Sequence, residues 1–320
     1  MKAALYHAPG APGVLFYGDA PDPVAQPGQV LIRVAAISIE GGDLVNRGIT
    51  RPADLDVPLG YAAAGTVMAL GEGVAGFAIG DRVTTFAFRG SHGELRAVDA
   101  AGCWAIPDGL GMDVAAAIPC GPGTAAHVLR SLRAGQTVLI QGAAGGVGVA
   151  AVQIAKQRGA RVIGTGTRAA TLDKLRPLGL DDAVVVGDGP VPAQVRALTQ
   201  GRGVDLVVDN IGGPAITEAL ESCRDGGTVV LVGVLGGREE RIDPMRLLYR
   251  RQTVTGCLFG AVVHEPAEHQ LVTDLLAQAA AGRFQLPIDR CFSLKDAAAA
   301  HAYAETRGRI GRVIIHPETP

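Results

Sequence analysis

The sequence predicts an α/β protein in which a doubly wound parallel sheet is joined to a second, β-rich domain. Three observations lead to this prediction. From residue 138 to residue 258, short β-branched runs alternate with segments whose apolar residues have helical spacing. The first of these strand–helix connections is a glycine loop, Gly142–Gly148. Before residue 107 the chain reads as short strands set apart by Gly, Pro and Asp.

The amino-terminal domain is expected to be a partly open antiparallel barrel with long loops. Its predicted strands are Ala3–Tyr6, Val30–Ile37, Gly65–Leu70, Arg82–Phe88, Glu94–Val98 and Cys103–Ile106. No helix of ordinary length is predicted before Gly111. A loop over Ser38–Gly48 contains two acids and an arginine, which is dense for a connection and indicates a functional role.

The second domain is expected to follow two helices, Leu110–Ile118 and Gly123–Leu132. Its predicted strands are Val138–Gln141, Arg161–Gly164, Ala183–Val186, Val204–Asp209, Thr228–Val232 and Thr253–Leu258. Its predicted helices are Val149–Arg158, Ala170–Leu178, Pro192–Thr199 and Pro214–Cys223. This alternation is typical of a doubly wound sheet.

The carboxyl-terminal tail is too small to be a domain of its own. It is predicted to contain helix Pro266–Ala281, strand Ile288–Phe292, helix Lys295–Glu305 and strand Arg312–His316. We expect it to return to the first domain, which then comprises residues 1–122 and 261–320. The nucleotide domain comprises residues 123–260, and a cleft separates the two.

The glycine loop predicts a dinucleotide site. Gly145 lets the backbone approach a diphosphate, and Gly148 lets the following helix start close to the strand. The first N–H groups of that helix, around Gly146 and Val147, point at the anion. Ala143 stands where the commonest fingerprint has its first glycine. A structural glycine turn without a ligand is the alternative.

The end of the second strand favours NADPH over NADH. Folds that prefer NAD place a carboxylate roughly 20 residues past the glycines, where it accepts hydrogen bonds from the ribose. This chain has Gly166-Thr167-Arg168 there, with no acid to repel a 2′-phosphate. Thr167 can donate a hydrogen bond to that phosphate and Arg168 can form a charge-assisted pair with it. Alternatively, Arg168 is a solvated cation that starts the next helix.

The composition is that of a globular protein with a large core. Of the 320 residues, 48% are hydrophobic and 19% charged, and the net charge of −2 argues against binding to nucleic acid or an anionic membrane. No apolar run approaches the roughly 18 residues of a membrane span. The amino end lacks an apolar signal region, so we expect a cytoplasmic protein.

The cysteines and histidines show no recognisable motif. The five cysteines are scattered, which argues against a disulfide framework and against a metal knuckle, and reduced thiols are expected. Of the seven histidines, His264 and His269 alone lie close together, and a helical spacing of five points them in different directions. We therefore expect no metal site.

These motifs resemble the medium-chain dehydrogenase/reductase superfamily, specifically its zinc-free quinone oxidoreductase branch, the zeta-crystallin-like proteins. The likeness covers essentially the whole chain and rests on Ala143–Gly148 with Gln153–Lys156, Asp205–Gly213, Gly227–Gly233 and Gly308–Val313. It implies a Rossmann-type domain and a discontinuous GroES-like β-barrel domain. It also implies a homodimer, formed by edge-to-edge pairing of the sixth strand, Thr253–Leu258, with its twin.

The resemblance also bears on the reaction. The similar zinc alcohol dehydrogenases use a Cys in the first long loop and a Gly-His-Glu after the next proline. The matching residues here, Ile39, Glu40 and Tyr61, cannot supply a thiolate and an imidazole to zinc. Hydride addition to a conjugated carbonyl does not need a Lewis acid. The resemblance therefore implies NADPH-dependent reduction of a small quinone or α,β-unsaturated carbonyl without a metal.

Two residues are the catalytic candidates. Glu40 stands where the family has an Asn, and it can accept a hydrogen bond from a ribose hydroxyl or the carboxamide; alternatively, it holds its own loop's backbone N–H groups. Tyr61 can donate to the developing enolate. Asp43 and Arg47 match the family pattern and suggest an ion pair beside the nicotinamide, whereas Val45 replaces an aromatic residue.

Further cofactor-binding candidates come from the rest of the chain. Asn210 and Gly233 close the carboxyl ends of the fourth and fifth strands, where ligands lie in a doubly wound sheet. Thr124 matches a position at the nicotinamide end, and Leu258 and Phe259 are expected to cover the nicotinamide, with core packing as the alternative for Phe259. The last candidate is Arg309, which either reaches the 2′-phosphate or nicotinamide side or is a solvated surface residue.

An apolar acceptor pocket has four aromatic candidates, each with simple packing as its alternative: Tyr61, Phe86, Phe88 and Trp104. Two other functions stay open. A non-catalytic structural or sensor protein would bind NADPH tightly without turnover. An enoyl-thioester reductase would need a groove for an acyl carrier or coenzyme A, and no basic cluster in the sequence indicates one.

Overall fold

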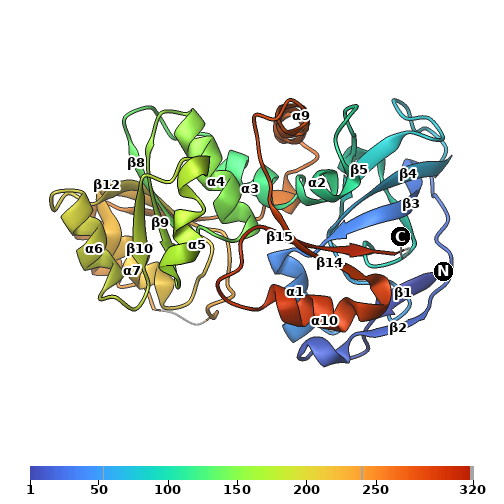
Figure 1. Cartoon of the computed structure of the whole chain (residues 1–320), viewed down its shortest axis with the longest axis horizontal. Helices are drawn as coiled ribbons and strands as arrows, with labels where there is room; N and C mark the ends of the chain where they lie inside the picture. Colours follow the sequence, from blue (N-terminus) through green and yellow to red (C-terminus); the bar gives the residue numbers. More distant parts are fainter. Residues whose placement is uncertain (53, 239–240, 318–320) are drawn as a thin grey trace. The chain divides into compact units, whose positions relative to one another are not determined.

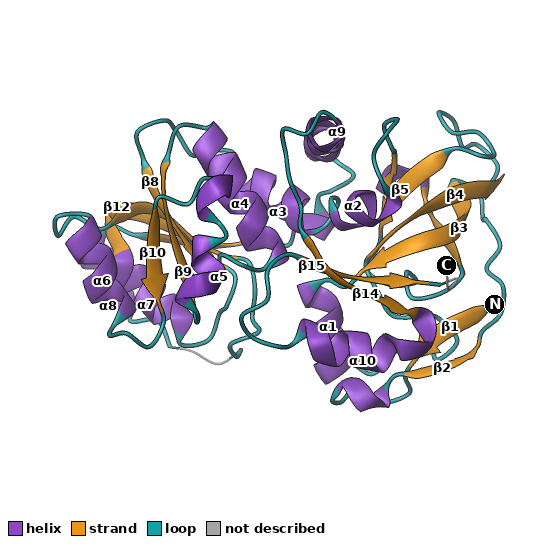
Figure 2. Cartoon of the chain, viewed as in Figure 1, coloured by secondary structure: helices purple, strands orange, loops and turns teal. Residues whose placement is uncertain are grey.

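The computed structural model describes residues 1–52, 54–238 and 241–317, and the chain divides into two compact units (Figure 1). One unit contains Met1–Gly123, Phe259–Thr306 and Gly311–Pro320. The other contains Thr124–Leu258 and Arg307–Ile310. Each unit is built around its own sheet, drawn as orange strands in Figure 2.

The second unit has the predicted doubly wound sheet. Its described strands form one parallel sheet in the order β10-β9-β8-β11-β12-β13. The strands are β8 (Thr137–Gln141), β9 (Arg161–Gly166), β10 (Asp182–Val185), β11 (Val204–Asp209), β12 (Cys223–Leu231) and β13 (Thr253–Gly256). The helices are α4 (Gly146–Gln157), α5 (Ala169–Asp173), α6 (Val191–Leu198), α7 (Ala215–Ser222) and α8 (Pro244–Arg250). The strand order reverses between β8 and β11, which is where such sheets bind ligands.

The core of this sheet explains its apolar strands. Leu139, Ile163, Val207 and Val229 are fully buried at the centre. Strands of a parallel sheet are covered on both faces, so they read as continuous hydrophobic runs. All six predicted strands are present; β12 begins at Cys223, five residues before the predicted start at Thr228, and the ends of the other five agree within two residues.

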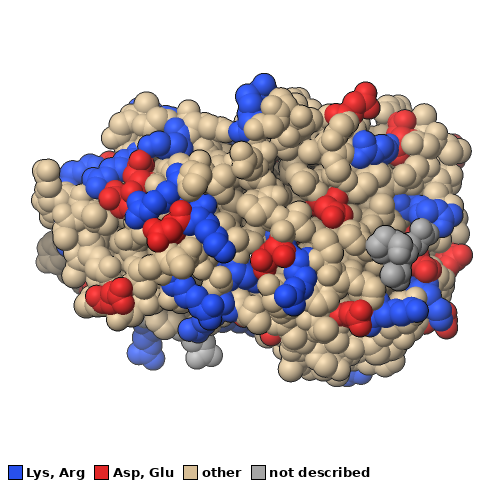
Figure 3. Space-filling model, in the orientation of Figure 1, with Lys and Arg blue, Asp and Glu red and all other residues tan. Residues whose placement is uncertain are grey.

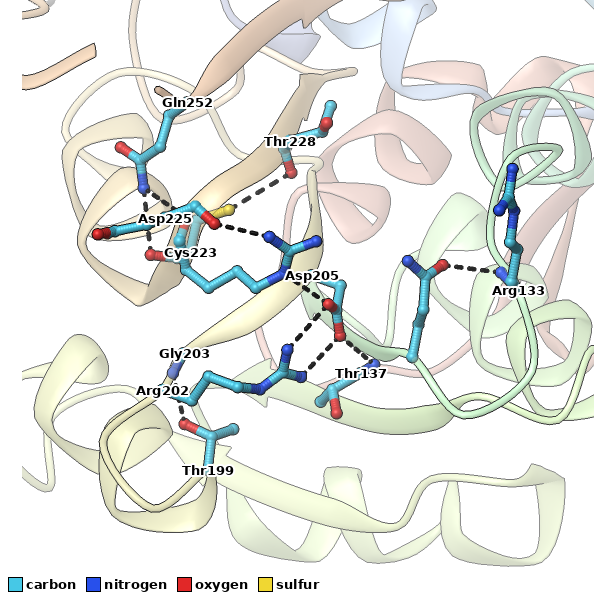
Figure 4. Close-up of polar contacts among 12 residues, drawn as sticks. Arg133, Thr137, Thr199, Arg202, Gly203, Asp205, Cys223, Asp225, Thr228 and Gln252 are labelled. Carbon is cyan, nitrogen blue, oxygen red and sulfur yellow. Dashed lines mark hydrogen bonds and ion pairs between the residues drawn. The ribbon is translucent and has the colours of Figure 1, made fainter. Parts of the chain in front are cut away.

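Asp205 joins the starts of three neighbouring strands (Figure 4). Its carboxylate accepts hydrogen bonds from the Thr137 backbone N–H at 2.8 Å, from Arg202 at 2.8 and 3.0 Å, and from Arg224 at 2.6 Å. Burial alone would raise the pKa of Asp205, but these donors outweigh it and lower the pKa. The network fixes β8, β11 and β12 at the end opposite the glycine loop.

The first unit is built on a mixed sheet that two strands from the carboxyl-terminal tail complete. Its path is β14-β15-β3-β4-β5-β7, and β6 also pairs with β3. These strands are β3 (Gln29–Ser38), β4 (Ala62–Leu70), β5 (Arg82–Phe86), β6 (Leu95–Asp99), β7 (Cys103–Ala105), β14 (Ile288–Ser293) and β15 (Arg312–His316). A separate antiparallel pair joins β1 (Lys2–Leu5) to β2 (Phe16–Asp19), and β2 was not predicted. Because β15 pairs with β3, the tail returns to the first sheet.

The helices of the first unit correct the prediction at one important place. They are α1 (Gly41–Ile49), α2 (Met112–Ala117), α9 (Pro266–Ala280) and α10 (Ala297–Ala304), while α3 (Gly121–Val128) spans the boundary between the units. The predicted loop over residues 38–48 is therefore wrong, since α1 occupies most of it. The helix was not predicted because Gly42 has a poor helix propensity. Glycine is needed there because an added Cβ would lie 2.2 Å from the Tyr61 ring.

Two further differences lie in the second unit. The predicted helix Ala170–Leu178 ends as α5 at Asp173, and a 3-10 turn follows at Arg176–Leu178 because Pro177 has no N–H to donate. The chain also forms α8, which was not predicted. Its N-cap is Asp243, whose carboxylate accepts from the Met245 N–H at 3.0 Å.

The described surface carries both signs of charge. On the face shown in Figure 3, Lys and Arg are interspersed with Asp and Glu. Within the described ranges, no helix is both long enough and apolar enough to span a bilayer.

Candidate functional site

The glycine loop forms an open anion site at the start of α4. Gly145 is the N-cap and is exposed, and an added Cβ there would meet only the Gly142 carbonyl oxygen, at 3.5 Å. Gly146 and Val147 form the first turn, whose N–H groups have no acceptor within the helix. These groups and the helix dipole suit a diphosphate.

The tight turn before α4 has a different origin from the one the fingerprint suggests. Gly142, not residue 143, adopts a positive φ of 68°. Ala143 is fully buried, and a Cβ on Gly164 would lie 2.9 Å from its methyl group. An added Cβ on Gly148 would lie 2.5 Å from the Gly142 carbonyl oxygen, so the helix does start close to the strand. Gly142 thus provides the positive φ for the tight turn that the first glycine of the fingerprint usually makes.

A basic group lies at the end of β9. Gly166 ends the strand, Thr167 and Arg168 are exposed, and Arg168 is the N-cap residue of α5. A Cβ on Gly308 would lie 2.4 Å from Arg168 Cδ, so the arginine side chain runs across the segment that carries Arg309. This segment is fixed by Thr171 Oγ1, which donates to the Gly308 carbonyl at 2.9 Å. The structure thus brings Arg168 and the Arg309 segment together.

Asn210 lies beside the glycine loop. Its Nδ2 donates to the Gln141 carbonyl at 2.9 Å, while its buried Oδ1 has no hydrogen-bond partner among the described residues. A Cβ on Gly233 would lie 2.3 Å from the Asn210 carbonyl oxygen, so these two strand ends are in close contact. An unpaired buried acceptor at the carboxyl edge of the sheet fits a ligand with hydroxyl or amide donors.

The remaining cofactor candidates differ in exposure. Leu258 is 65% exposed, whereas Phe259 is 3% exposed and its ring contacts Gly123, where an added Cβ would lie 2.5 Å from Phe259 Cε1. Phe259 is therefore a core side chain of the first unit, so it can cover a nicotinamide only through its backbone. Thr124 is buried in α3.

In the first unit, Glu40 forms a buried ion pair. Its carboxylate lies 2.5 Å from Arg312 Nη2, and the two side chains are 2% and 6% exposed. Ser38 Oγ donates to the other carboxylate oxygen at 2.9 Å. The Cys120 thiol also hydrogen-bonds to Glu40, and burial is the main reason that the pKa of Cys120 is raised. Arg312 and Cys120 were missed because nothing local in the sequence links them to Glu40.

The predicted ion pair between Asp43 and Arg47 is wrong. Asp43 caps α1 by accepting the Glu40 backbone N–H at 2.8 Å, and burial raises the pKa of this carboxyl. Arg47, at the other end of α1, pairs with Glu305 and donates to the Gly10 carbonyl at 3.2 Å. Asp43 and Arg47 therefore lie at opposite ends of α1 and bind different partners.

Tyr61 is held in a cluster of three aromatic rings. Its ring meets Phe86 and Phe88 edge to face at centroid distances of 5.7 and 5.4 Å. Its hydroxyl oxygen accepts a hydrogen bond from Asn46 Nδ2 at 2.9 Å, and burial raises the pKa of Tyr61. Trp104 does not belong to this cluster: it is buried, stacks on His269 at 4.6 Å and donates to the His269 carbonyl.

A buried histidine pair contacts Arg47 in the last turn of α1. His92 Nε2 lies 3.0 Å from His301 Nε2, and His301 Nδ1 lies 3.4 Å from Arg47 Nη1. Burial, with a smaller effect of Arg96, lowers the pKa of His92 to about 3. Burial, together with His92 and Arg47, lowers the pKa of His301 well below its usual value.

These lowered histidine pKa values predict that acid reduces the stability of the folded chain. Below pH 6.5 the unfolded chain binds protons that the folded chain excludes, so the free energy of unfolding falls as pH decreases towards 3. The slope is up to about 1.4 kcal/mol per pH unit for each histidine. Urea unfolding at several pH values, followed by Trp104 fluorescence, should give a shallower slope for His92→Asn. An unchanged slope for His92→Asn, equal to that of the exposed-residue control His264→Asn, would contradict the prediction.

Two family models match the chain. The alcohol dehydrogenase GroES-like domain matches residues 26–129, and the zinc-binding dehydrogenase domain matches residues 146–278. A 2-haloacrylate reductase from Burkholderia sp and a quinone oxidoreductase from Pseudomonas aeruginosa are each 30% identical over 99% of both chains. The chain belongs to the medium-chain dehydrogenase/reductase superfamily. Within it, the chain falls in the quinone oxidoreductase branch.

Two further comparisons match in structure or over part of a longer protein. A mycobacterial structure complexed with NADPH has a TM-score of 0.93 and 30% identity, covering 99% of this chain and 100% of that one. The phthioceranic/hydroxyphthioceranic acid synthase of Mycobacterium tuberculosis is 31% identical over 92% of this chain, which spans only 14% of that much longer protein.

The contacts of the two catalytic candidates, Glu40 and Tyr61, show what each side chain can do. Here the Glu40 carboxylate is neutralised by Arg312, and the Tyr61 hydroxyl is held by Asn46. The Glu40 carboxylate is thus committed to protein partners, whereas the Tyr61 oxygen accepts from Asn46 and keeps its O–H as a donor.

Proposed function

We propose that the protein is an NADPH-dependent reductase that transfers hydride to a quinone or an α,β-unsaturated carbonyl without a metal. The main support is that one unit contains both an open glycine loop and the exposed Arg168. In the other unit, Glu40 forms a buried ion pair with Arg312. The names of the two full-length relatives, a quinone oxidoreductase and a 2-haloacrylate reductase, agree with this class of reaction.

The residues of the second unit fit the cofactor. Gly145, Gly146 and Val147 would hold the diphosphate, and Thr167 and Arg168 would hold the 2′-phosphate, with Arg309 nearby. The unpaired Asn210 Oδ1 offers an acceptor to a ribose hydroxyl or the carboxamide. Bound NADPH supplies a hydride from C4 of its nicotinamide. We propose that Thr124, Gly233, Leu258 and Phe259 complete the nicotinamide end.

Tyr61 is the proposed hydrogen-bond donor to the acceptor substrate. Because its oxygen already accepts from Asn46, its own O–H is free to donate to a carbonyl oxygen of the acceptor. Its raised pKa keeps it protonated at neutral pH. A hydrogen-bond donor at this point would stabilise the enolate that develops as hydride arrives, and the enolate would then take its proton from solvent water, so that the acceptor gains one hydride and one proton.

Glu40 is proposed to hold Ser38 and Arg312 in place rather than to take part in the reaction. Both of its carboxylate oxygens are occupied, one by Ser38 and one by Arg312. The arginine also offsets the negative charge that would otherwise disfavour an anionic intermediate. Phe86 and Phe88, beside Tyr61, offer an apolar surface for a conjugated ring or alkene.

The experiment is an oxidation assay. Purified protein is mixed with NADPH and a panel of quinones, alkenals, enones, 2-haloacrylates and an enoyl thioester, and loss of NADPH absorbance is followed. We expect turnover with a quinone or enone. Tight NADPH binding without turnover of any compound would favour the structural or sensor function instead. Turnover of the thioester alone would favour the enoyl-thioester reductase.

Arg168→Ala should shift the cofactor preference. Loss of a charge-assisted hydrogen bond costs about 1.5–3 kcal/mol, so KM for NADPH should rise about 10- to 150-fold while KM for NADH changes little. Steady-state kinetics with both nucleotides provides the measurement. The control is Arg176→Ala, an exposed arginine paired with Asp173 on the same connection. Equal effects on the two nucleotides would contradict a 2′-phosphate site.

We also propose a homodimer formed by β13. This strand is at the edge of its sheet, and α8, which leads into it, exposes Leu248 and Tyr249. Light scattering after gel filtration should give twice the mass of one chain, and Tyr249→Glu should give a monomer. Ile79→Lys, at an exposed position in the other unit, is the control. A monomeric wild type, or a Tyr249→Glu variant that stays dimeric, would contradict this interface.

A further inference from the structure

Three metal-ligating side chains from distant parts of the sequence meet on the first unit. Asp113 lies on α2, Cys291 on the edge strand β14 and His316 at the end of β15. One ligand atom of each lies within 4.8 Å of the others. We propose that these three residues form a binding site for a zinc-like divalent transition metal. They take no part in the proposed NADPH or acceptor sites.

The donor set selects the class of metal. A carboxylate, a thiolate and an imidazole are the three side-chain ligands that zinc prefers. Calcium and magnesium take oxygen ligands, so Cys291 argues against both. Because Cys291 is exposed and the other two are partly exposed, an ion can enter from solvent and water can supply a fourth ligand.

The distances are close to those of a tetrahedral site. Zinc–ligand bonds of about 2.0–2.3 Å place neighbouring ligand atoms about 3.3–3.6 Å apart. Here His316 Nε2 lies 2.8 Å from Asp113 Oδ1, and Cys291 Sγ lies 3.9 Å from Asp113 Oδ2. Side-chain shifts of about 1 Å, which small χ rotations provide, would therefore seat the ion.

The backbone holds the ligands in place before any ion binds. β14 and β15 pair in parallel, with Cys291 opposite Ile314 and Ser293 opposite His316. Cys291 and His316 are therefore offset by two residues on neighbouring strands, which puts them on the same face of the sheet. Asp113 approaches from the first turn of α2. A bound ion would thus tie the last strand to an edge strand and a helix.

The test uses metal-free, full-length protein titrated with Co²⁺ and then with Zn²⁺. We expect one equivalent of Co²⁺ to bind with a sulfur-to-cobalt charge-transfer band, and Zn²⁺ to displace it. Cys291→Ser should abolish the band. His316→Gln should weaken binding by more than the roughly 10- to 100-fold that loss of an outer-shell group costs. Matched controls are Cys257→Ser and His264→Gln, which should bind Co²⁺ like the wild type.

Each alternative outcome is distinct. If no band forms, or if the band survives in Cys291→Ser, the site does not exist and the Asp113–His316 contact is a surface ion pair. Wild-type affinity in His316→Gln would overturn the proposal as well. Urea unfolding of each variant, followed by Trp104 fluorescence in the same unit, shows that the chain is folded. Since the site shares no residue with the proposed NADPH site, failure of one leaves the other standing.

Discussion

Gly145→Val is expected to abolish NADPH binding while the chain stays folded. The Gly145 backbone is extended, with φ −72° and ψ 171°, which valine adopts readily. An added Cβ would meet only the Gly142 carbonyl oxygen at 3.5 Å, an ordinary contact. The valine side chain would, however, cover the N–H groups at the start of α4. We expect NADPH affinity to fall at least 100-fold, or about 2.7 kcal/mol, in a fluorescence titration.

Two further glycine variants sharpen this prediction. Gly111→Val is the matched control: Gly111 is the N-cap of α2, with φ −69° and ψ 150°, and nothing lies within 4 Å of an added Cβ. It should bind NADPH normally. Gly148→Val should instead prevent folding, because its Cβ would lie 2.5 Å from the Gly142 carbonyl oxygen. Normal NADPH affinity in Gly145→Val would show that the diphosphate binds elsewhere.

Arg312→Met is expected to destabilise the first unit by about 3–5 kcal/mol. The substitution leaves the Glu40 carboxylate buried with only Ser38 as a side-chain hydroxyl donor, and an uncompensated buried charge is costly. Urea unfolding followed by Trp104 fluorescence is the measurement. Trp104 is the chain's single tryptophan and lies in the first unit, so the signal reports this unit.

A double-mutant cycle separates charge from packing. Glu40→Gln combined with Arg312→Met removes both charges, and we expect it to be more stable than Arg312→Met alone. The control is Lys2→Met, which breaks an ion pair with Asp19 in the same unit whose side chains are 43% and 83% exposed, and should cost less than about 1 kcal/mol. If Arg312→Met loses no more stability than this control, the buried ion pair contributes no more to stability than an exposed one.

Local sequence patterns were sufficient for most of the nucleotide unit. The strand predicted at Val204–Asp209 is confirmed at those residues because a buried parallel strand is a continuous apolar run. The turn before α4 was predicted from its glycines, although Gly142 rather than residue 143 takes the positive φ. Helix α1 was missed altogether, and a loop was predicted in its place, because Gly42 has a weak helix propensity and is present for packing against Tyr61.

The sequence by itself determined the doubly wound sheet, the glycine loop and the basic residue at the end of β9. Each of these depends on neighbours within a few residues, whose spacing and propensity can be read directly. Only the tertiary structure decided which charges meet: Glu40 with Arg312, Arg47 with Glu305, and Asp113 with Cys291 and His316. A buried or clustered charge takes the partner that long-range strand pairing and helix packing bring to it, and that partner leaves no signal in the local sequence.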